Sequence, residues 1–156
     1  MKYFLSSGEE VRDRVDSHLH QTAVALLPEA LQKISANGRG FTIEEVKFDR
    51  IVGESDCVPT GPEDAIIFAK RPNRWGLTRF VRNRQPEKSS SVVVILKKAE
   101  EGNFFILITA FIGSIAPPEP WDRNATSESR NFWNTHALVW GSQEVISGTE
   151  SLDCPW

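Results

Sequence analysis

Two apolar segments dominate the centre of the chain: Ser91-Val-Val-Val-Ile-Leu-Lys97 and Phe104-Phe-Ile-Leu-Ile-Thr-Ala-Phe-Ile112. Nearly continuous runs of β-branched and apolar residues are typical of central strands that are covered on both faces. Between them, Glu100-Glu-Gly-Asn103 supplies a polar, glycine-containing turn. The pattern therefore predicts a β-hairpin at the centre of a sheet.

Further strands are predicted on both sides of this hairpin. Phe41 to Val52 alternates imperfectly, and it is followed by a predicted loop from Gly53 to Pro62. Two shorter candidates follow, Ala65 to Ala69 and Leu77 to Arg84, and His136 to Trp140 is a final one. These strands extend the hairpin into an antiparallel meander.

Helical patterns come before the strands. Apolar residues recur at helical spacing from Val11 to Leu27 and continue to Ile34, where Asn37-Gly38 is a suitable helix end. Pro28 either kinks this helix or starts a second one. Thr126 to Trp133 is a further short helix candidate. The sequence thus predicts an α+β fold, with one or two N-terminal helices packed on a curved antiparallel sheet of four to five strands.

The length of 156 residues suits one domain, which we expect over residues 1–141, with a polar C-terminal tail over 142–156. No stretch resembles a signal peptide, and the longest apolar run is too short for a membrane span. Cys57 and Cys154 lack the spacing of a zinc site or a disulfide framework. We therefore expect a cytoplasmic protein without a membrane contact.

The segment from Ile66 to Pro86 carries a local basic charge. It contributes +6 without an intervening carboxylate, whereas the whole chain has a net charge of −3. A basic patch with aromatic neighbours on an acidic protein indicates contact with a polyanion such as RNA. The cations are Lys70, Arg71, Arg74, Arg79, Arg82 and Arg84, and the aromatic neighbours are Trp75 and Phe80.

Arg79 stands apart from the other cations. In a strand it shares a face with Leu77 and Val81, the face that we expect to pack. A half-buried arginine needs a carboxylate partner or an anionic ligand. Two interpretations stay open: an internal salt bridge to an acidic residue, or a clamp on a phosphate group. The acidic candidates are Glu119, Asp122 and Glu45.

Few residues suit acid–base chemistry. His18 and His20 fall on different sides of the predicted N-terminal helix and make a poor metal chelate. His136 begins a predicted strand, where a side chain can enter a cleft. Thr109 is the one polar residue of its apolar strand and needs a hydrogen-bond partner. For each of these residues a structural role is the alternative to a functional one.

Several sites are excluded by what the sequence lacks. It has no glycine-rich phosphate loop, no G-x-S-x-G elbow, no H-E-x-x-H and no Asp-rich metal cluster. We therefore expect no cofactor and no metal, which leaves metal-independent acid–base chemistry or no chemistry.

Three segments resemble the barnase–EndoU–colicin–RelE-like RNase superfamily of toxin systems and its phage-associated relatives. They are Trp75-Gly-Leu-Thr-Arg-Phe-Val81, Val92-Val-Val-Ile-Leu96 and Phe105-Ile-Leu-Ile-Thr-Ala-Phe-Ile112. The resemblance implies helices ahead of a curved antiparallel sheet and RNA cleavage without a metal. The segments Glu119-Pro-Trp-Asp122 and Phe132-Trp-Asn-Thr-His136 are not part of the superfamily pattern.

The resemblance also implies roles for residues. His18 or His20 would be the helix-borne acid–base group, Arg79 the strand-borne cation and Thr109 the late-strand hydroxyl, while His136 is a further acid–base candidate. Cleavage would proceed through attack of the 2′-OH and leave a 2′,3′-cyclic phosphate. Single-stranded or tRNA-like RNA would contact Lys70, Arg71, Arg74, Trp75, Arg82 and Arg84.

Two other classes of function remain. A non-catalytic module would bind RNA or an acidic protein through the same basic strand. An immunity or antitoxin-type protein would instead use the acidic surface outside the basic segment. An RNase toxin would itself have a cognate inhibitor protein as a partner.

Overall fold

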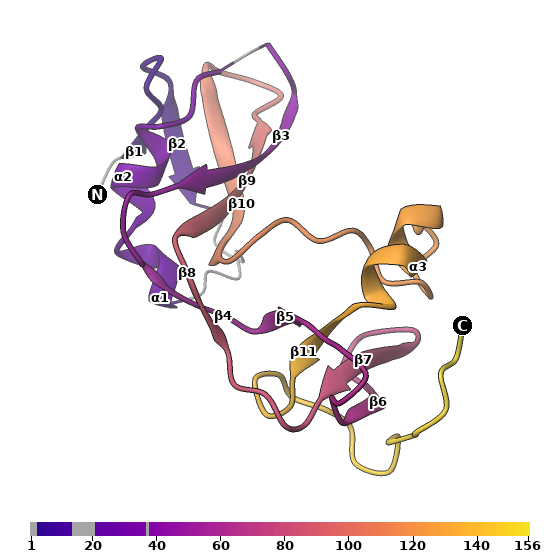
Figure 1. The fold of residues 1–156 in the computed structure, drawn as a ribbon. Coiled ribbons are helices and arrows are strands. Elements are labelled where there is room, and N and C mark those ends of the chain that lie inside the picture. Colours follow the sequence, from indigo (N-terminus) through magenta and orange to yellow (C-terminus); the bar gives the residue numbers. More distant parts are fainter. Residues whose placement is uncertain (1–2, 14–20, 37) are drawn as a thin grey trace. The chain divides into compact units, whose positions relative to one another are not determined.

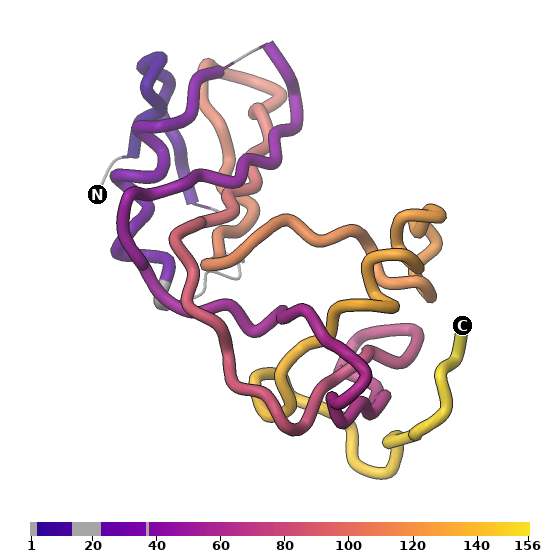
Figure 2. The backbone as a smooth tube through the Cα atoms, in the orientation of Figure 1, coloured from indigo at the N-terminus to yellow at the C-terminus, as the bar shows by residue number. Residues whose placement is uncertain are grey.

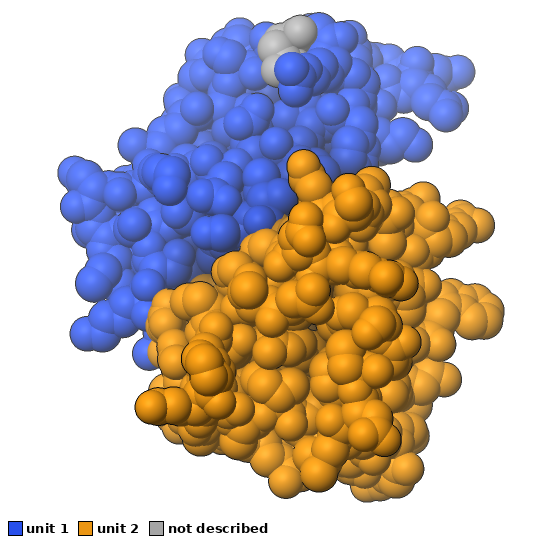
Figure 3. Space-filling view, turned by 45° about the vertical axis from the view of Figure 1, so that its right-hand side comes forward, with its two compact units in different colours: residues 1–54, 88–115 blue, residues 55–87, 116–156 orange. Residues whose placement is uncertain are grey.

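The computed structural model describes residues 3–13, 21–36 and 38–156 (Figure 1). The chain is α+β, with few helices and many strands in mixed sheets. It divides into two compact units, which Figure 3 colours separately: residues 1–54 with 88–115, and residues 55–87 with 116–156. His18 and His20, with much of the predicted first helix, lie outside the described residues.

Unit 1 is built on a five-stranded sheet of order β1-β2-β10-β9-β3. Strand β2 is parallel to β10, and the other described pairs are antiparallel, so this sheet is mixed. Its elements are β1 (Tyr3–Phe4), β2 (Glu10–Asp13), α1 (Gln21–Val24), α2 (Leu27–Leu31), β3 (Phe41–Lys47), β9 (Ser91–Lys98) and β10 (Phe104–Ile112).

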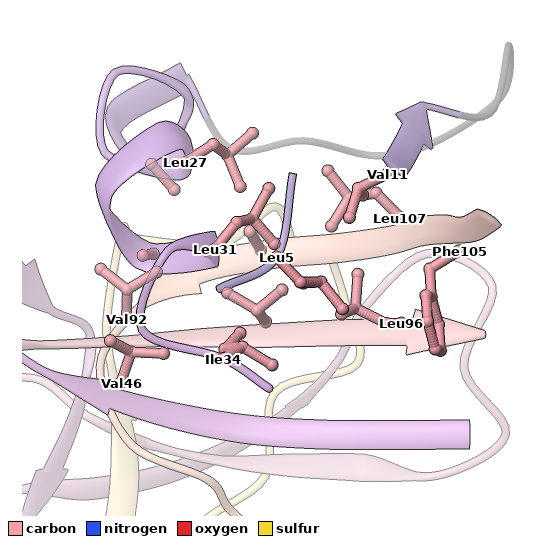
Figure 4. Close-up of a cluster of buried hydrophobic side chains, with 14 of the residues drawn as sticks. Leu5, Val11, Leu27, Leu31, Ile34, Val46, Val92, Leu96, Phe105 and Leu107 are labelled. Atoms are coloured by element: carbon pink, nitrogen blue, oxygen red, sulfur yellow. The ribbon is translucent and has the colours of Figure 1, made fainter. Parts of the chain in front are cut away.

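The predicted central hairpin is confirmed. Strands β9 and β10 pair antiparallel, from Phe105 opposite Lys98 to Ile112 opposite Val92. The register shifts between Leu107 and Thr109, which marks a β-bulge. Side chains of both strands enter the core of unit 1, because one face of this hairpin is covered by the N-terminal elements (Figure 4).

The N-terminal segment differs from the predicted continuous helix. Val11 lies in β2 and pairs with Phe105, so the apolar stripe began in a strand rather than in a helix. The alternation of Glu10-Val-Arg-Asp13 places Val11 inward, which satisfies strand periodicity as well as helical spacing. The helices in the described residues are short. Pro28 lies in the first turn of α2, where a proline is tolerated, and α2 buries Leu27 and Leu31.

Unit 2 contains a four-stranded sheet of order β5-β11-β7-β6. Strand β11 is parallel to β7, whereas β6 and β7 form an antiparallel hairpin. Its elements are β5 (Cys57–Pro59), β6 (Ile66–Lys70), β7 (Leu77–Val81), α3 (Ser127–Trp133) and β11 (His136–Val139). A separate two-stranded sheet is formed by β4 (Gly53–Ser55) and β8 (Glu87–Ser89).

Most of the predicted elements of unit 2 are confirmed, with shifts of a few residues at their ends. The predicted strands 65–69 and 136–140 and the helix 126–133 correspond to β6, β11 and α3, and β7 is the first part of the predicted strand 77–84. The loop expected from Gly53 to Pro62 is wrong, because it holds β4 and β5. Val58 of β5 is fully buried, although a strand of this length leaves almost no pattern in the sequence.

The polar C-terminal segment pairs with the edge strand β6 (Figure 2). Phe68 N–H donates to the Ser151 carbonyl and Ser151 N–H donates to the Phe68 carbonyl, both at 2.8 Å. Lys70 N–H donates to Thr149 Oγ1 at 3.0 Å. These bonds occupy the outer edge of the β6–β7 hairpin.

None of the helices formed by the described residues combines the length and the apolar character that crossing a membrane requires.

We expect Leu107→Ala to lower the free energy of unfolding by about 2–5 kcal/mol, because it leaves a cavity in a closely packed core. Leu107 is 0% exposed in the core of unit 1, whereas Ile51 of the same unit is 62% exposed. Ile51→Ala removes as many carbon atoms and should change stability by less than about 0.5 kcal/mol. Far-UV circular dichroism in urea measures both; equal losses would show that β10 is not part of the core.

Candidate nucleic-acid interface

The β6–β7 hairpin carries the basic segment. Its strands pair from Ile66 opposite Val81 to Lys70 opposite Leu77, and residues 71–76 connect them. Asn73 adopts a positive φ of 61°, a conformation that asparagine tolerates better than most residues. Gly76 lies against the Trp121 side chain and leaves no room for a Cβ atom. The connecting loop of the hairpin therefore packs, at Gly76, against the segment that contains Trp121.

Arg71 is a structural residue of this hairpin. Its Nη2 lies 2.6 Å from Glu119 Oε2, and its Nε donates to Thr78 Oγ1 at 3.1 Å. The Arg71 and Glu119 side chains are 16% and 9% exposed, and Thr78 is fully buried. Glu119 was one of the partners that we expected for Arg79, so the ion pair exists but the arginine is a different one. Arg71 points into the protein and not to a ligand.

Arg84 is also occupied by internal contacts. Its Nη1 lies 3.3 Å from Asp64 Oδ2 and its Nη2 lies 3.2 Å from Glu87 Oε1. The same Nη2 donates to the Pro59 carbonyl at 3.2 Å. The Arg84 side chain is 35% exposed, so these contacts neutralise its charge without removing it from the surface.

Both faces of β7 pack. Arg79 is half-buried on the face that it shares with the fully buried Val81, whereas Thr78 and Phe80 are fully buried on the opposite face. Its Nη1 donates to Thr60 Oγ1 at 2.8 Å and to the His136 carbonyl at 2.9 Å. Burial lowers the pKa of Arg79, and the nearby Cys154 and Asp64 act in the opposite direction.

Besides Arg79, which binds a hydroxyl and a main-chain carbonyl, three cations of the segment form no ion pair with the described residues. Lys70 is half-buried, and Arg74 and Arg82 are exposed. The Arg82 guanidinium lies 5.1 Å from the Trp140 ring centre, a cation–π contact that leaves its charge available. Trp75 follows Arg74 at the hairpin tip and is 92% exposed. We call Lys70, Arg74, Trp75 and Arg82 the hairpin surface.

His136 is held in a defined orientation. Its Nδ1 lies 3.0 Å from the Phe132 carbonyl, and its ring stacks on the Phe132 ring with centres 3.9 Å apart. Because a carbonyl only accepts hydrogen bonds, Nδ1 carries the proton and Nε2 is the acceptor in the neutral ring. Nε2 has no partner among the described residues. Arg79 binds the main chain of this same residue.

The other candidate catalytic residues are distributed over the chain. Thr109 lies half-buried beside the bulge of β10, in unit 1, whereas Arg79 and His136 are neighbours in unit 2. His18 and His20 lie outside the described residues. Among the described residues, no three His, Cys, Asp or Glu side chains lie together in an arrangement that could hold a metal ion.

Several buried or half-buried polar groups lie in unit 2, and the sequence had indicated only Glu119 and Asp122 among them, as possible ion-pair partners. Glu119 Oε1 and Trp121 Nε1 are buried without a hydrogen-bond partner. Burial, with the carboxylates of Asp56 and Glu119, raises the pKa of Cys57 to about 12, so this thiol is protonated at neutral pH. Asp122 accepts from Asn124 N–H at 2.8 Å and stabilises its own loop. Glu119 and Trp121 are structural here, and the ligand-accessible groups lie on the hairpin surface.

No protein-family model matches the chain, and no curated protein or solved structure matches it either. The function is therefore argued from the chemistry of unit 2 itself.

We expect Glu119→Ala to lower the free energy of unfolding by about 3–5 kcal/mol, because it leaves the Arg71 charge buried without a partner. The control Glu29→Ala removes one half of an exposed pair, 2.9 Å from Arg50 Nη2, and should cost less than about 1 kcal/mol. All five tryptophans lie in unit 2, so their fluorescence in urea follows this unit. An equally small loss for both variants would contradict the structural role of the Arg71–Glu119 pair.

Proposed function

We propose that the protein binds single-stranded RNA through the hairpin surface of unit 2. The exposure of Trp75, at 92%, carries this proposal. Because so little of the Trp75 side chain is covered by the described residues, its indole offers a flat apolar face to an incoming ring. Bases that are not stacked in a duplex can occupy such a face, and base–aromatic stacking contributes about 1–3 kcal/mol per base.

Three charges of the hairpin support the same ligand: Arg74 is next to Trp75 at the tip, Lys70 ends β6, and Arg82 follows β7 at the opposite end. Lys70, Arg74 and Arg82 are not neutralised by carboxylates of the described residues, and phosphate groups are their natural partners. Arg71 and Arg84, which the sequence also placed in this group, are held by internal acidic residues. The acidic charge of the rest of the chain disfavours polyanion binding elsewhere. The proposed interface is therefore smaller than the basic segment of the sequence.

An acidic protein partner would also neutralise these cations, but its carboxylates would not stack on an exposed indole ring. RNA as the ligand also implies a cytoplasmic place of action, which forms part of this proposal. A toxin of this kind would have a cognate inhibitor, and the hairpin surface is where such an inhibitor would exclude RNA.

We expect Trp75→Ala to weaken the binding of a fluorescein-labelled uridine oligonucleotide about 5- to 100-fold, because the stacking platform is lost. Arg74→Ala and Arg82→Ala should each reduce the magnitude of the slope of log K against log salt by about 0.7. Fluorescence anisotropy over a salt series measures both quantities.

The control is Arg50→Ala, since Arg50 lies in unit 1 in an exposed pair with Glu29 and should leave binding unchanged. Equal affinity for a duplex of the same length, or no effect of Trp75→Ala, would contradict the stacking of an unpaired base. Tight binding of polyglutamate in place of RNA would favour the acidic protein partner.

Catalysis is a second candidate, and the proximity of Arg79 to His136 favours it. His136 presents an unoccupied Nε2, which is able to take the proton of a ribose 2′-OH or to protonate the leaving 5′-oxygen. Arg79 would stabilise the charge of the pentacovalent phosphorane. The resemblance to metal-independent endoribonucleases assigns the complementary roles to His18 or His20 and to Thr109. The products would be a 2′,3′-cyclic phosphate and a 5′-hydroxyl.

If this second proposal is correct, purified protein cleaves RNA in EDTA, and Arg79→Ala and His136→Ala each reduce the rate by about 100-fold or more. His20→Ala tests the helix-borne group in the same assay. Arg123→Ala, an exposed arginine of unit 2, should retain full activity. Intact RNA in the presence of folded wild-type protein would leave binding as the function.

A further inference from the structure

Strand β3 forms one edge of the five-stranded sheet in unit 1. Its neighbour is β9, with Phe41 opposite Lys97 and Lys47 opposite Ser91. No other described strand pairs with β3. An edge strand of this kind presents unpaired backbone groups that are able to accept another strand.

The outward backbone groups follow from the ladder. Phe48 N–H donates to the Ser90 carbonyl and Lys98 N–H donates to the Gly40 carbonyl, so the even-numbered residues are the ones that hydrogen-bond to β9. The N–H and C=O groups of Phe41, Ile43 and Glu45 therefore point away from the sheet. No hydrogen bond from the main chain of these residues to the described part of the chain is present on that side.

The side chains of this edge are unusual for one that faces water. Phe41 is 55% exposed and Ile43 is 44% exposed, whereas Thr42 and Val46 point to the core and are each 6% exposed. The strand has no proline and no bulge, two of the devices that prevent edge-to-edge pairing, although it does carry a third, charged side chains, at Glu44, Glu45 and Lys47. An open ladder with two adjacent apolar side chains favours a strand as its occupant.

The sequence of β3 is complementary to itself in one antiparallel register. With a two-fold axis at Thr42, Phe41 lies opposite the partner's Ile43, and Arg39 lies opposite the partner's Glu45. Within its own chain the Glu45 carboxylate also contacts Lys47 Nζ at 3.5 Å and accepts from Ile115 N–H at 2.9 Å. In this register, apolar side chains lie opposite apolar side chains, and the positive Arg39 lies opposite the negative Glu45. An axis at Glu44 would instead oppose two glutamates, and an axis at Ile43 would oppose Lys47 to the partner's Arg39.

We propose that β3 pairs with β3 of a second copy of this chain, with Thr42 at the two-fold axis. The two five-stranded sheets then continue into one, and Phe41 and Ile43 are covered by their counterparts. This interface lies wholly in unit 1 and does not depend on RNA binding by unit 2.

The first test is the mass of the full chain in solution by light scattering after size exclusion, over a concentration series. We expect a dimer for the wild type and at least a tenfold higher dissociation constant for Ile43→Lys. Ile51→Lys, the same change at a residue 62% exposed in the same unit, should dimerise like the wild type. A wild-type monomer throughout, or a dimer insensitive to Ile43→Lys, would overturn the proposal.

The second test reads the register. Opposed residues of a hydrogen-bonded antiparallel pair have Cα atoms about 5.5 Å apart, within the range of a disulfide. In a Cys154→Ser background, which removes the exposed native thiol, a mixture of Phe41→Cys and Ile43→Cys chains should oxidise to a mixed dimer. Each variant alone should crosslink several-fold less. Equal crosslinking of mixed and single variants would overturn the pairing.

Discussion

The ion pair between Arg71 and Glu119 is the interaction on which unit 2 depends. It joins the loop that connects β6 to β7 to the proline-rich segment that follows residue 115. Both side chains are nearly buried, with N and O atoms 2.6 Å apart. Thr78 completes the contact from β7. A buried pair is not in itself a large source of stability, because both charges lose their hydration. It is specific, however, since removing either charge leaves the other unpaired, and this fixes which arginine of the segment turns inward.

This division of the cations is central to the proposed function. Six basic residues occur between Lys70 and Arg84, yet the structure uses them differently. Arg71 and Arg84 hold the hairpin to acidic residues, and Arg79 contacts a hydroxyl and a main-chain carbonyl. The remaining cations lie on the same hairpin as the exposed indole of Trp75, which suits a ligand that carries both phosphates and unstacked bases. The same fold therefore separates the charges that build the scaffold from those that can bind.

The two compact units carry different surfaces. Unit 2 presents the hairpin surface, whereas unit 1 presents an open sheet edge with apolar side chains on β3. The edge of the sheet in unit 2 is closed differently, because the C-terminal segment pairs with β6 through Ser151. That contrast gives the open β3 edge its significance: the C-terminal segment pairs with the edge strand β6 of one sheet, whereas no described strand pairs with the outer side of β3.

The sequence by itself determined the strands whose apolar patterns are long and continuous. The hairpin of β9 and β10 was predictable because both strands are long and almost continuously apolar, and the α+β class followed from the order of the elements. Strand β2 was predicted as the start of a helix, since Val11 fits strand and helix spacing equally well. Strand β5 was missed because it is too short to leave a pattern. Likewise the sequence located the basic segment, because charge accumulation is local. Tertiary structure alone decided which cations remain free: the partners of Arg71 and Arg84 come from other segments, and only folding brings Glu119 and Asp64 to them.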